Sequence, residues 1–121
     1  MNTQRAWVVV SGITGFLGVA FGAFGAHILK PQLSFEMMEI FRTGVLYQLI
    51  HSAVMLSVAL SGIQKYLKAE IFFLTGVILF SFTLYLYSLT SIKLFAMITP
   101  VGGVFFLTGW IMIILRALRQ D

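Results

Sequence analysis

Four long apolar segments, separated by short segments that carry the charged residues, form the main pattern of this chain. The charge-free windows run from Ala6 to Leu29, Thr43 to Gln64, Ile71 to Ile92 and Leu94 to Leu115. Each window is at least about 20 residues long, which as a helix is enough to cross a hydrocarbon core of about 30 Å. The pattern predicts an all-α, four-transmembrane-helix bundle forming a single integral membrane domain over residues 1–121. The predicted spans are approximately 6–29, 42–63, 70–91 and 99–117.

The segment between the first two spans predicts a short helix of its own. Pro31 is expected to stop the first helix, and Ser34 is a plausible N-cap with Glu36 in the first turn. Apolar residues then recur at three-residue steps, at Phe35, Met38 and Phe41. This spacing is typical of a helix that lies in the membrane interface. We therefore expect a short interfacial helix between spans 1 and 2 that runs into span 2.

The start of the fourth helix is predicted from the pair Thr99 and Pro100. Threonine is a favoured N-cap, and proline is favoured at the first helical position. The pair predicts a helix that begins near Thr99. Residues 94–98 would then form an apolar connection that returns to the bundle.

Composition supports a membrane protein and bears on its orientation. Hydrophobic residues make up 60% of the chain and charged residues 10%, and the net charge is +4. The eight lysines and arginines sit at span ends, so they indicate topology rather than a nucleic-acid partner. Five of them fall on one side of the predicted bundle (Arg5, Lys65, Lys68, Arg116, Arg119) and three on the other (Lys30, Arg42, Lys93). Positive-inside bias predicts a protein of the cell inner or plasma membrane with both termini in the cytoplasm.

Small residues line one face of several spans and predict close helix packing. Gly15, Gly18, Gly22 and Ala26 share a face of the first span at three- and four-residue spacing. Gly44 in the second span, and Gly102 and Gly109 in the fourth, would likewise let a neighbouring helix approach closely. The pattern does not decide between packing within the chain and packing between copies. We expect a lipid bilayer as surroundings and a homo-oligomer or a larger membrane complex as the assembly.

The second span carries the least expected chemistry of the chain. Gly44, Gln48, His51 and Met55 fall on one face of a helix, and His51 lies roughly 13 Å beyond Arg42 by helical rise. An ionisable group at that depth is a functional candidate unless the protein itself satisfies it. The candidate polar pocket consists of Tyr47, Gln48, His51, Ser81, Thr83 and Tyr85. His51 is either a structural group bonded to a hydroxyl or a carbonyl, or a site of proton relay, quinone contact or haem ligation.

Other chemistry is hard to build from this sequence. Cysteine is absent, which excludes disulfides and thiolate metal sites. His27 lies at a different depth from His51, so we expect no metal site and no cofactor. Glu36, Glu39, Glu70 and Asp121 are expected in loops or at the terminus, unlike the buried carboxylate of small multidrug-resistance exporters. No catalytic constellation is present, so we expect no enzymatic activity.

Four ordered motifs resemble a family of small membrane proteins. They are Gly22-Ala23-Phe24-Gly25-Ala26-His27-x-Leu29, Phe41-x-Thr43-Gly44-Val45-x-Tyr47-Gln48-x-x-His51, Leu79-Phe80-Ser81-x-x-Leu84-Tyr85 and Ile98-Thr99-Pro100-x-Gly102-Gly103-x-x-Phe106-x-x-Gly109-Trp110. Together they resemble the DUF423 family, which includes relatives named transmembrane protein 256 in animals. The resemblance covers essentially the whole chain. It implies a four-helix integral membrane protein and supplies no activity and no ligand set.

Two functions remain open from the sequence. The first is a structural or accessory membrane component that packs through its glycine-rich helix faces. The second is a binding or transport protein whose polar pocket around Gln48 and His51 receives a lipid, a quinone or a small solute.

Overall fold

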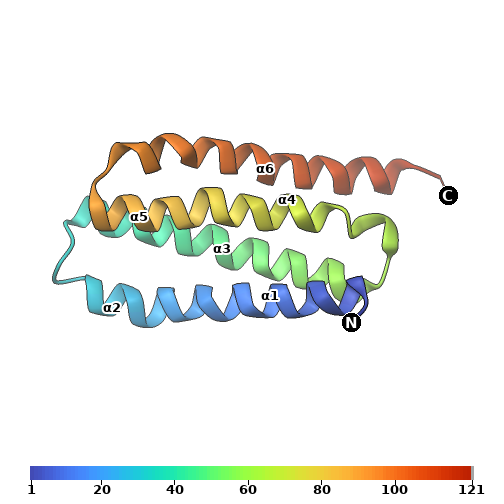
Figure 1. Ribbon diagram of the computed structural model, residues 1–121, viewed down its shortest axis with the longest axis horizontal. Coiled ribbons are helices and arrows are strands. Elements are labelled where there is room, and N and C mark those ends of the chain that lie inside the picture. Colours follow the sequence, from blue (N-terminus) through green and yellow to red (C-terminus); the bar gives the residue numbers. More distant parts are fainter. Residues whose placement is uncertain (121) are drawn as a thin grey trace.

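The computed structural model describes residues 1–120, and these form an antiparallel bundle of four long helical rods (Figure 1). Four helical stretches are long and apolar enough to cross a membrane: Thr3–Leu29, Phe35–Ser61, Ala69–Thr90 and Lys93–Leu118. Both chain ends lie at the same end of the bundle, as an even number of crossings requires. We call this the terminal end. The expected all-α, four-helix bundle is therefore confirmed.

The first rod consists of α1 (Thr3–Ala20), the π-helical turn η1 (Phe21–Gly25) and α2 (Ala26–Leu29). Asn2 caps its start, because the side chain of Asn2 accepts a hydrogen bond from the backbone N–H of Arg5 at 2.8 Å. The rod ends at Leu29, two residues before Pro31, whose ring cannot continue a helix. The first rod packs mainly against α3.

The expected short interfacial helix between spans 1 and 2 is not seen. Residues 30–34 form a turn, and a single helix, α3 (Phe35–Ser61), begins directly after it. Ser34 is the N-cap as expected, with its hydroxyl accepting from the N–H of Met37 at 3.2 Å. No proline interrupts the next 27 residues, and Gly44 packs closely against the ring of Tyr85. The segment from Phe35 to Arg42 is therefore the first two turns of α3.

The third rod follows a compact connection at the terminal end. α3 stops at Gly62, which takes the left-handed conformation with φ of 68°. After the 3₁₀ turn η2 (Gln64–Tyr66), the rod consists of α4 (Ala69–Gly76), the π-helical segment η3 (Val77–Phe82) and α5 (Thr83–Thr90). It ends at Ser91, which also takes a positive φ, of 58°. The second rod, α3, packs against this third rod, as is usual for antiparallel helices joined by a short connection.

The prediction that the fourth helix begins near Thr99 is wrong. α6 extends from Lys93 to Leu118 and contains Pro100 in its interior. Proline is tolerated inside membrane helices because side chains and neighbouring helices can satisfy the freed backbone groups. Pro100 has no N–H for the carbonyl of Ala96, four residues earlier. The hydroxyl of Thr99 donates to the neighbouring carbonyl of Phe95 at 3.1 Å. Residues 94–98 belong to α6, so the apolar connection predicted for this segment is also wrong.

Glycines let the rods approach closely within the chain. A Cβ added at Gly18 would lie 2.7 Å from Cδ2 of Leu49, and one at Gly22 would lie 2.8 Å from Cγ1 of Val45. Gly15 lies against Ser52, Gly109 against the ring of Phe73, and Ala26 beside the cluster around Phe41. The face of Gly15, Gly18 and Gly22 is thus occupied by α3. These glycines give no argument for contact between copies of the chain.

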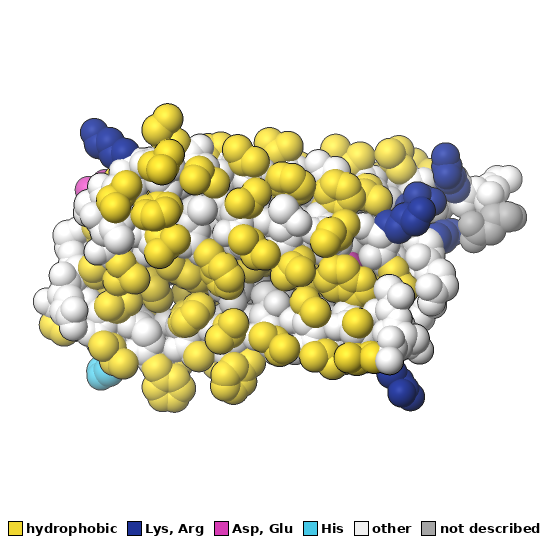
Figure 2. Space-filling model, in the orientation of Figure 1, with side chains coloured by type: hydrophobic (Ala, Val, Ile, Leu, Met, Phe, Trp, Pro, Cys, Tyr) yellow, Lys and Arg dark blue, Asp and Glu magenta, His cyan; other side chains and the backbone are white. Residues whose placement is uncertain are grey.

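The outer surface matches a membrane environment. Apolar side chains cover the middle of the bundle in Figure 2, and lysines and arginines lie toward its two ends. Exposed apolar residues are present along each of the four rods. A surface of this kind is unusual for a soluble monomer and suits lipid.

Candidate functional site

Gln48 ties three of the four rods together at the centre of the bundle. Its side chain is fully buried, on the inward face of α3. The amide Nε2 donates to the carbonyl of Thr14 in α1 at 2.8 Å, and the amide Oε1 accepts from the hydroxyl of Tyr85 in α5 at 2.6 Å. Both ends of the amide therefore have protein partners. Thr14 was not among the predicted pocket residues.

His51 lies one turn further along α3 and is also bonded on both sides. The indole Nε1 of Trp110 donates to His51 Nε2 at 3.2 Å, and His51 Nδ1 lies 2.8 Å from the carbonyl oxygen of Tyr47. Because an indole N–H can only donate, Nε2 is the acceptor and Nδ1 carries the proton. The ring is a neutral imidazole and stacks on Phe106 at 3.7 Å between centroids. No predicted hydroxyl partner reaches His51.

The remaining predicted pocket residues do not converge on one cavity. The hydroxyl of Thr83 is bonded to that of Thr99 in α6 at 2.7 Å. Tyr47 is partly exposed, and its ring lies 4.5 Å from that of Phe80. Ser81 is fully buried in η3, and within the described residues its hydroxyl has no hydrogen-bonding partner. The structure therefore joins Gln48 to Tyr85 and His51 to the carbonyl of Tyr47, and it places Ser81 and Thr83 in separate contacts.

Glu70 is the polar residue that sequence analysis missed. The expectation that the acidic residues sit in loops or at the terminus is wrong for Glu36 and Glu39, which lie in the first turns of α3. It is also wrong for Glu70, which lies in the first turn of α4 and is fully buried. Neither carboxylate oxygen has a hydrogen-bonding partner among residues 1–120. Phe73 and Val77, three and seven residues later, are equally buried. This helical spacing was the available signal, because it places Glu70 on the inward face.

Metal-ligating side chains are dispersed. Across the part of the chain that the structure describes, no three His, Cys, Asp or Glu side chains come together as a metal site requires. His27 is exposed near the end of the first rod. Asp121, the fourth acidic residue, lies outside the described residues.

The bundle and its buried polar contacts define a small polytopic α-helical membrane protein. Residues 21–103 match the family described as a protein of unknown function, DUF423. The chain belongs to this family, which confirms the resemblance stated above. It is an integral membrane protein.

Curated relatives extend the match over nearly the whole chain. The UPF0382 inner membrane protein YgdD of Escherichia coli (strain K12) is 36% identical over 97% of this chain and 92% of the relative. The UPF0382 membrane protein YwdK of Bacillus subtilis (strain 168) is 36% identical over 96% of this chain and 98% of the relative. The UPF0382 membrane protein SSP2132 of Staphylococcus saprophyticus is 29% identical over 96% of this chain. No solved structure matches the chain.

Proposed function

We propose that this protein is a non-enzymatic structural or accessory component of the cell's inner or plasma membrane. The observation that carries the proposal is the pair of hydrogen bonds that hold the buried amide of Gln48, one to Thr14 and one to Tyr85. A fully buried amide with partners inside the chain at both its nitrogen and its oxygen stabilises one arrangement of helices. Both termini are proposed to be cytoplasmic.

The bonding of His51 supports the same role. Its two ring nitrogens are engaged by Trp110 and by the carbonyl of Tyr47, and Phe106 covers one ring face. Haem ligation or proton relay through this ring would first have to break one of those bonds. The ring instead holds α3 against α6 near the centre of the bundle. Any homo-oligomer or larger complex would form through the outer surface, because the inner faces are already filled.

The proposal predicts that small ligands leave the stability of the protein unchanged. The experiment is thermal unfolding of the purified protein in mild detergent, with and without ubiquinone, menaquinone or small polar solutes. We expect midpoints within experimental error of the ligand-free value. A rise with any of these ligands would overturn the proposal, and a larger rise in Trp110→Phe, which frees Nε2 of His51, would place that ligand at His51. Thr108→Val, on the same helix with an outward-facing hydroxyl, is the control.

A second function, binding or transport, is favoured by two buried groups without partners. The Glu70 carboxylate and the Ser81 hydroxyl are both fully buried and unpartnered within the described residues. An ionisable group inside a membrane protein without a partner is costly, and such groups mark ion and substrate pathways. Glu70 lies toward the terminal end and Ser81 beside Gly44, near the centre. A proton or a small cationic solute is the species that a buried carboxylate would take.

This second function predicts that Glu70 reacts with a hydrophobic carbodiimide, a reagent that modifies carboxyl groups in apolar surroundings. Mass spectrometry of the labelled protein in lipid nanodiscs should locate the modification at Glu70. The label should disappear in Glu70→Gln and persist in Glu39→Gln, whose carboxylate is exposed and paired with Arg42 at 2.8 Å. Labelling that is equal at Glu39 and Glu70, or absent from Glu70, would count against a carboxyl site reached through the membrane.

A further inference from the structure

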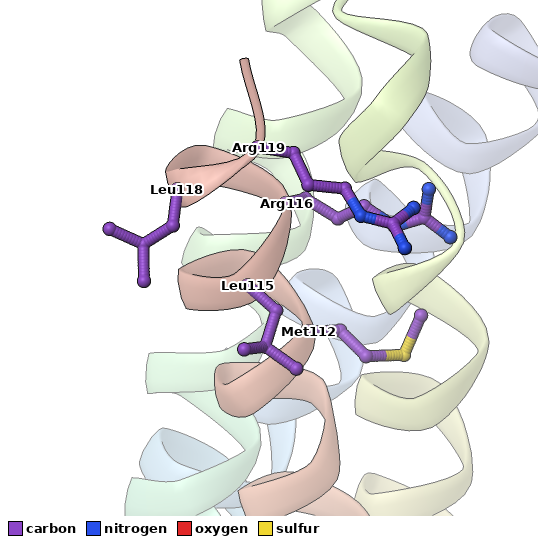
Figure 3. A pocket seen from close by; sticks show the side chains of 5 residues that line it. All are labelled: Met112, Leu115, Arg116, Leu118 and Arg119. Atoms are coloured by element: carbon purple, nitrogen blue, oxygen red, sulfur yellow. The ribbon is translucent and has the colours of Figure 1, made fainter. Parts of the chain in front are cut away.

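Two arginines at the C-terminal end of α6 line one cavity at the terminal end of the bundle. The cavity has a volume of about 480 Å³ and is lined by Met112, Leu115, Arg116, Leu118 and Arg119. In Figure 3 the side chains of Arg116 and Arg119, three residues apart, extend in the same direction, and that of Leu118 points away from them. Two guanidinium groups held this way repel each other unless an anion lies between them.

The chain supplies no anion for this pair among its described residues. Neither Arg116 nor Arg119 has an ionic or hydrogen-bonding partner within residues 1–120. Glu39 pairs with Arg42 at the opposite end, and Glu70 is buried without any partner. The carbonyl end of α6 does not attract anions by itself, so any negative ligand here must be held by the guanidinium groups.

The depth of the pair in the membrane points to lipid headgroups. α6 has 26 residues, which correspond to a length of about 39 Å and exceed the hydrocarbon thickness of about 30 Å. Arg116 and Arg119 occupy the last turn of α6 and the position directly after it, where the helix has left the hydrocarbon. Met112 and Leu115 lie one turn deeper on the same cavity and provide an apolar surface. Two positive side chains at the membrane surface, with apolar side chains just below them, match the headgroup and the acyl chains of an anionic phospholipid.

We propose that Arg116 and Arg119 bind the phosphate of an anionic phospholipid whose acyl chain lies along Met112 and Leu115. Guanidinium groups bind phosphate oxygens through paired N–H donors, which gives them an advantage over a lysine point charge. Lipid binding at this site should require these two arginines, whereas binding to a general positive surface would not depend on any particular pair. The lipid also fixes the last turn of α6 at the membrane surface.

The test measures lipid binding by native mass spectrometry and by thermal unfolding in detergent. Phosphatidylglycerol, phosphatidylcholine and inorganic phosphate are added separately to the whole protein. At a phosphatidylglycerol concentration about ten times its Kd, we expect the unfolding midpoint to rise by about 5 °C. Phosphatidylcholine and inorganic phosphate should have little effect. In Arg116→Gln/Arg119→Gln the affinity for phosphatidylglycerol should fall at least about tenfold.

The matched control removes the same charge from the same end. Arg5→Gln/Lys68→Gln changes two exposed residues outside the cavity and should keep the phosphatidylglycerol affinity within about twofold. Equal loss in this control would overturn the site in favour of general charge attraction. Equal stabilisation by inorganic phosphate would overturn the lipid in favour of a free-anion site. Equal stabilisation by phosphatidylcholine, whose phosphate is balanced by choline, would overturn the selection for an anionic lipid. Circular dichroism of each variant without lipid establishes that it remains folded.

Discussion

Replacement of Gly102 by alanine is expected to lower the free energy of unfolding by about 3 kcal/mol. A Cβ at this position would lie 2.5 Å from the carbonyl carbon of Leu79 and 2.8 Å from Cα of Phe80. These are backbone atoms of η3, so no side-chain rotation can relieve the contact. The helices α6 and η3 would have to separate, and the packing around Phe106 would loosen with them. Unfolding by SDS titration in mixed micelles measures the change.

The adjacent glycine provides the control for this prediction. A Cβ at Gly103 would meet only the ring of Phe80, at 3.9 Å, which is an ordinary contact. Gly103→Ala should therefore be neutral or slightly stabilising, because alanine is the better helix former. Equal destabilisation by the two substitutions would mean that backbone contact between α6 and η3 is not what Gly102 provides.

The number of spans and the bundle could be predicted because charge placement alone sets them. Lysines and arginines at the span ends divide the chain into segments of membrane length, and nothing in the tertiary structure can change that division. Helix ends were less predictable. Thr99 and Pro100 form a strong local start signal, but the preceding turns keep their helical bonds in the membrane and α6 begins at Lys93. Likewise, Phe35 to Arg42 joins α3 because no residue there interrupts the helix.

The candidate site was predicted as a set of residue types and not as a set of contacts. The helical face that carries Gln48 and His51 follows from spacing within one span, and the structure buries both side chains. Their partners Thr14 and Trp110 lie in other spans, at positions fixed only when the rods pack. Glu70 was missed because it follows Lys68 closely, and a nearby lysine suggests solvent. Its burial depends on how α4 is oriented in the bundle.

The Gln48 contacts give the second large effect that we expect. Gln48→Ala should lower the free energy of unfolding by about 2–4 kcal/mol, from a lost hydrogen bond on each side, a cavity and a buried Tyr85 hydroxyl without a partner. Tyr85→Phe removes only the 2.6 Å bond to Gln48 and should lower it by about 1 kcal/mol. SDS titration of both single variants and of the double variant gives the coupling between them.

The double variant distinguishes a direct bond from two independent packing effects. If the hydroxyl of Tyr85 donates to Gln48 in the folded protein, Tyr85→Phe should add little once Gln48 is alanine, giving a coupling of about 1 kcal/mol. Additive losses would mean that the two side chains act separately. Ser57→Ala is the control: the hydroxyl of Ser57 is exposed and bonds only to the carbonyl of Ala53 in the same helix. This substitution should change the free energy of unfolding by less than about 0.5 kcal/mol. A coupled, buried contact that joins three rods is what a structural role for this polar centre requires.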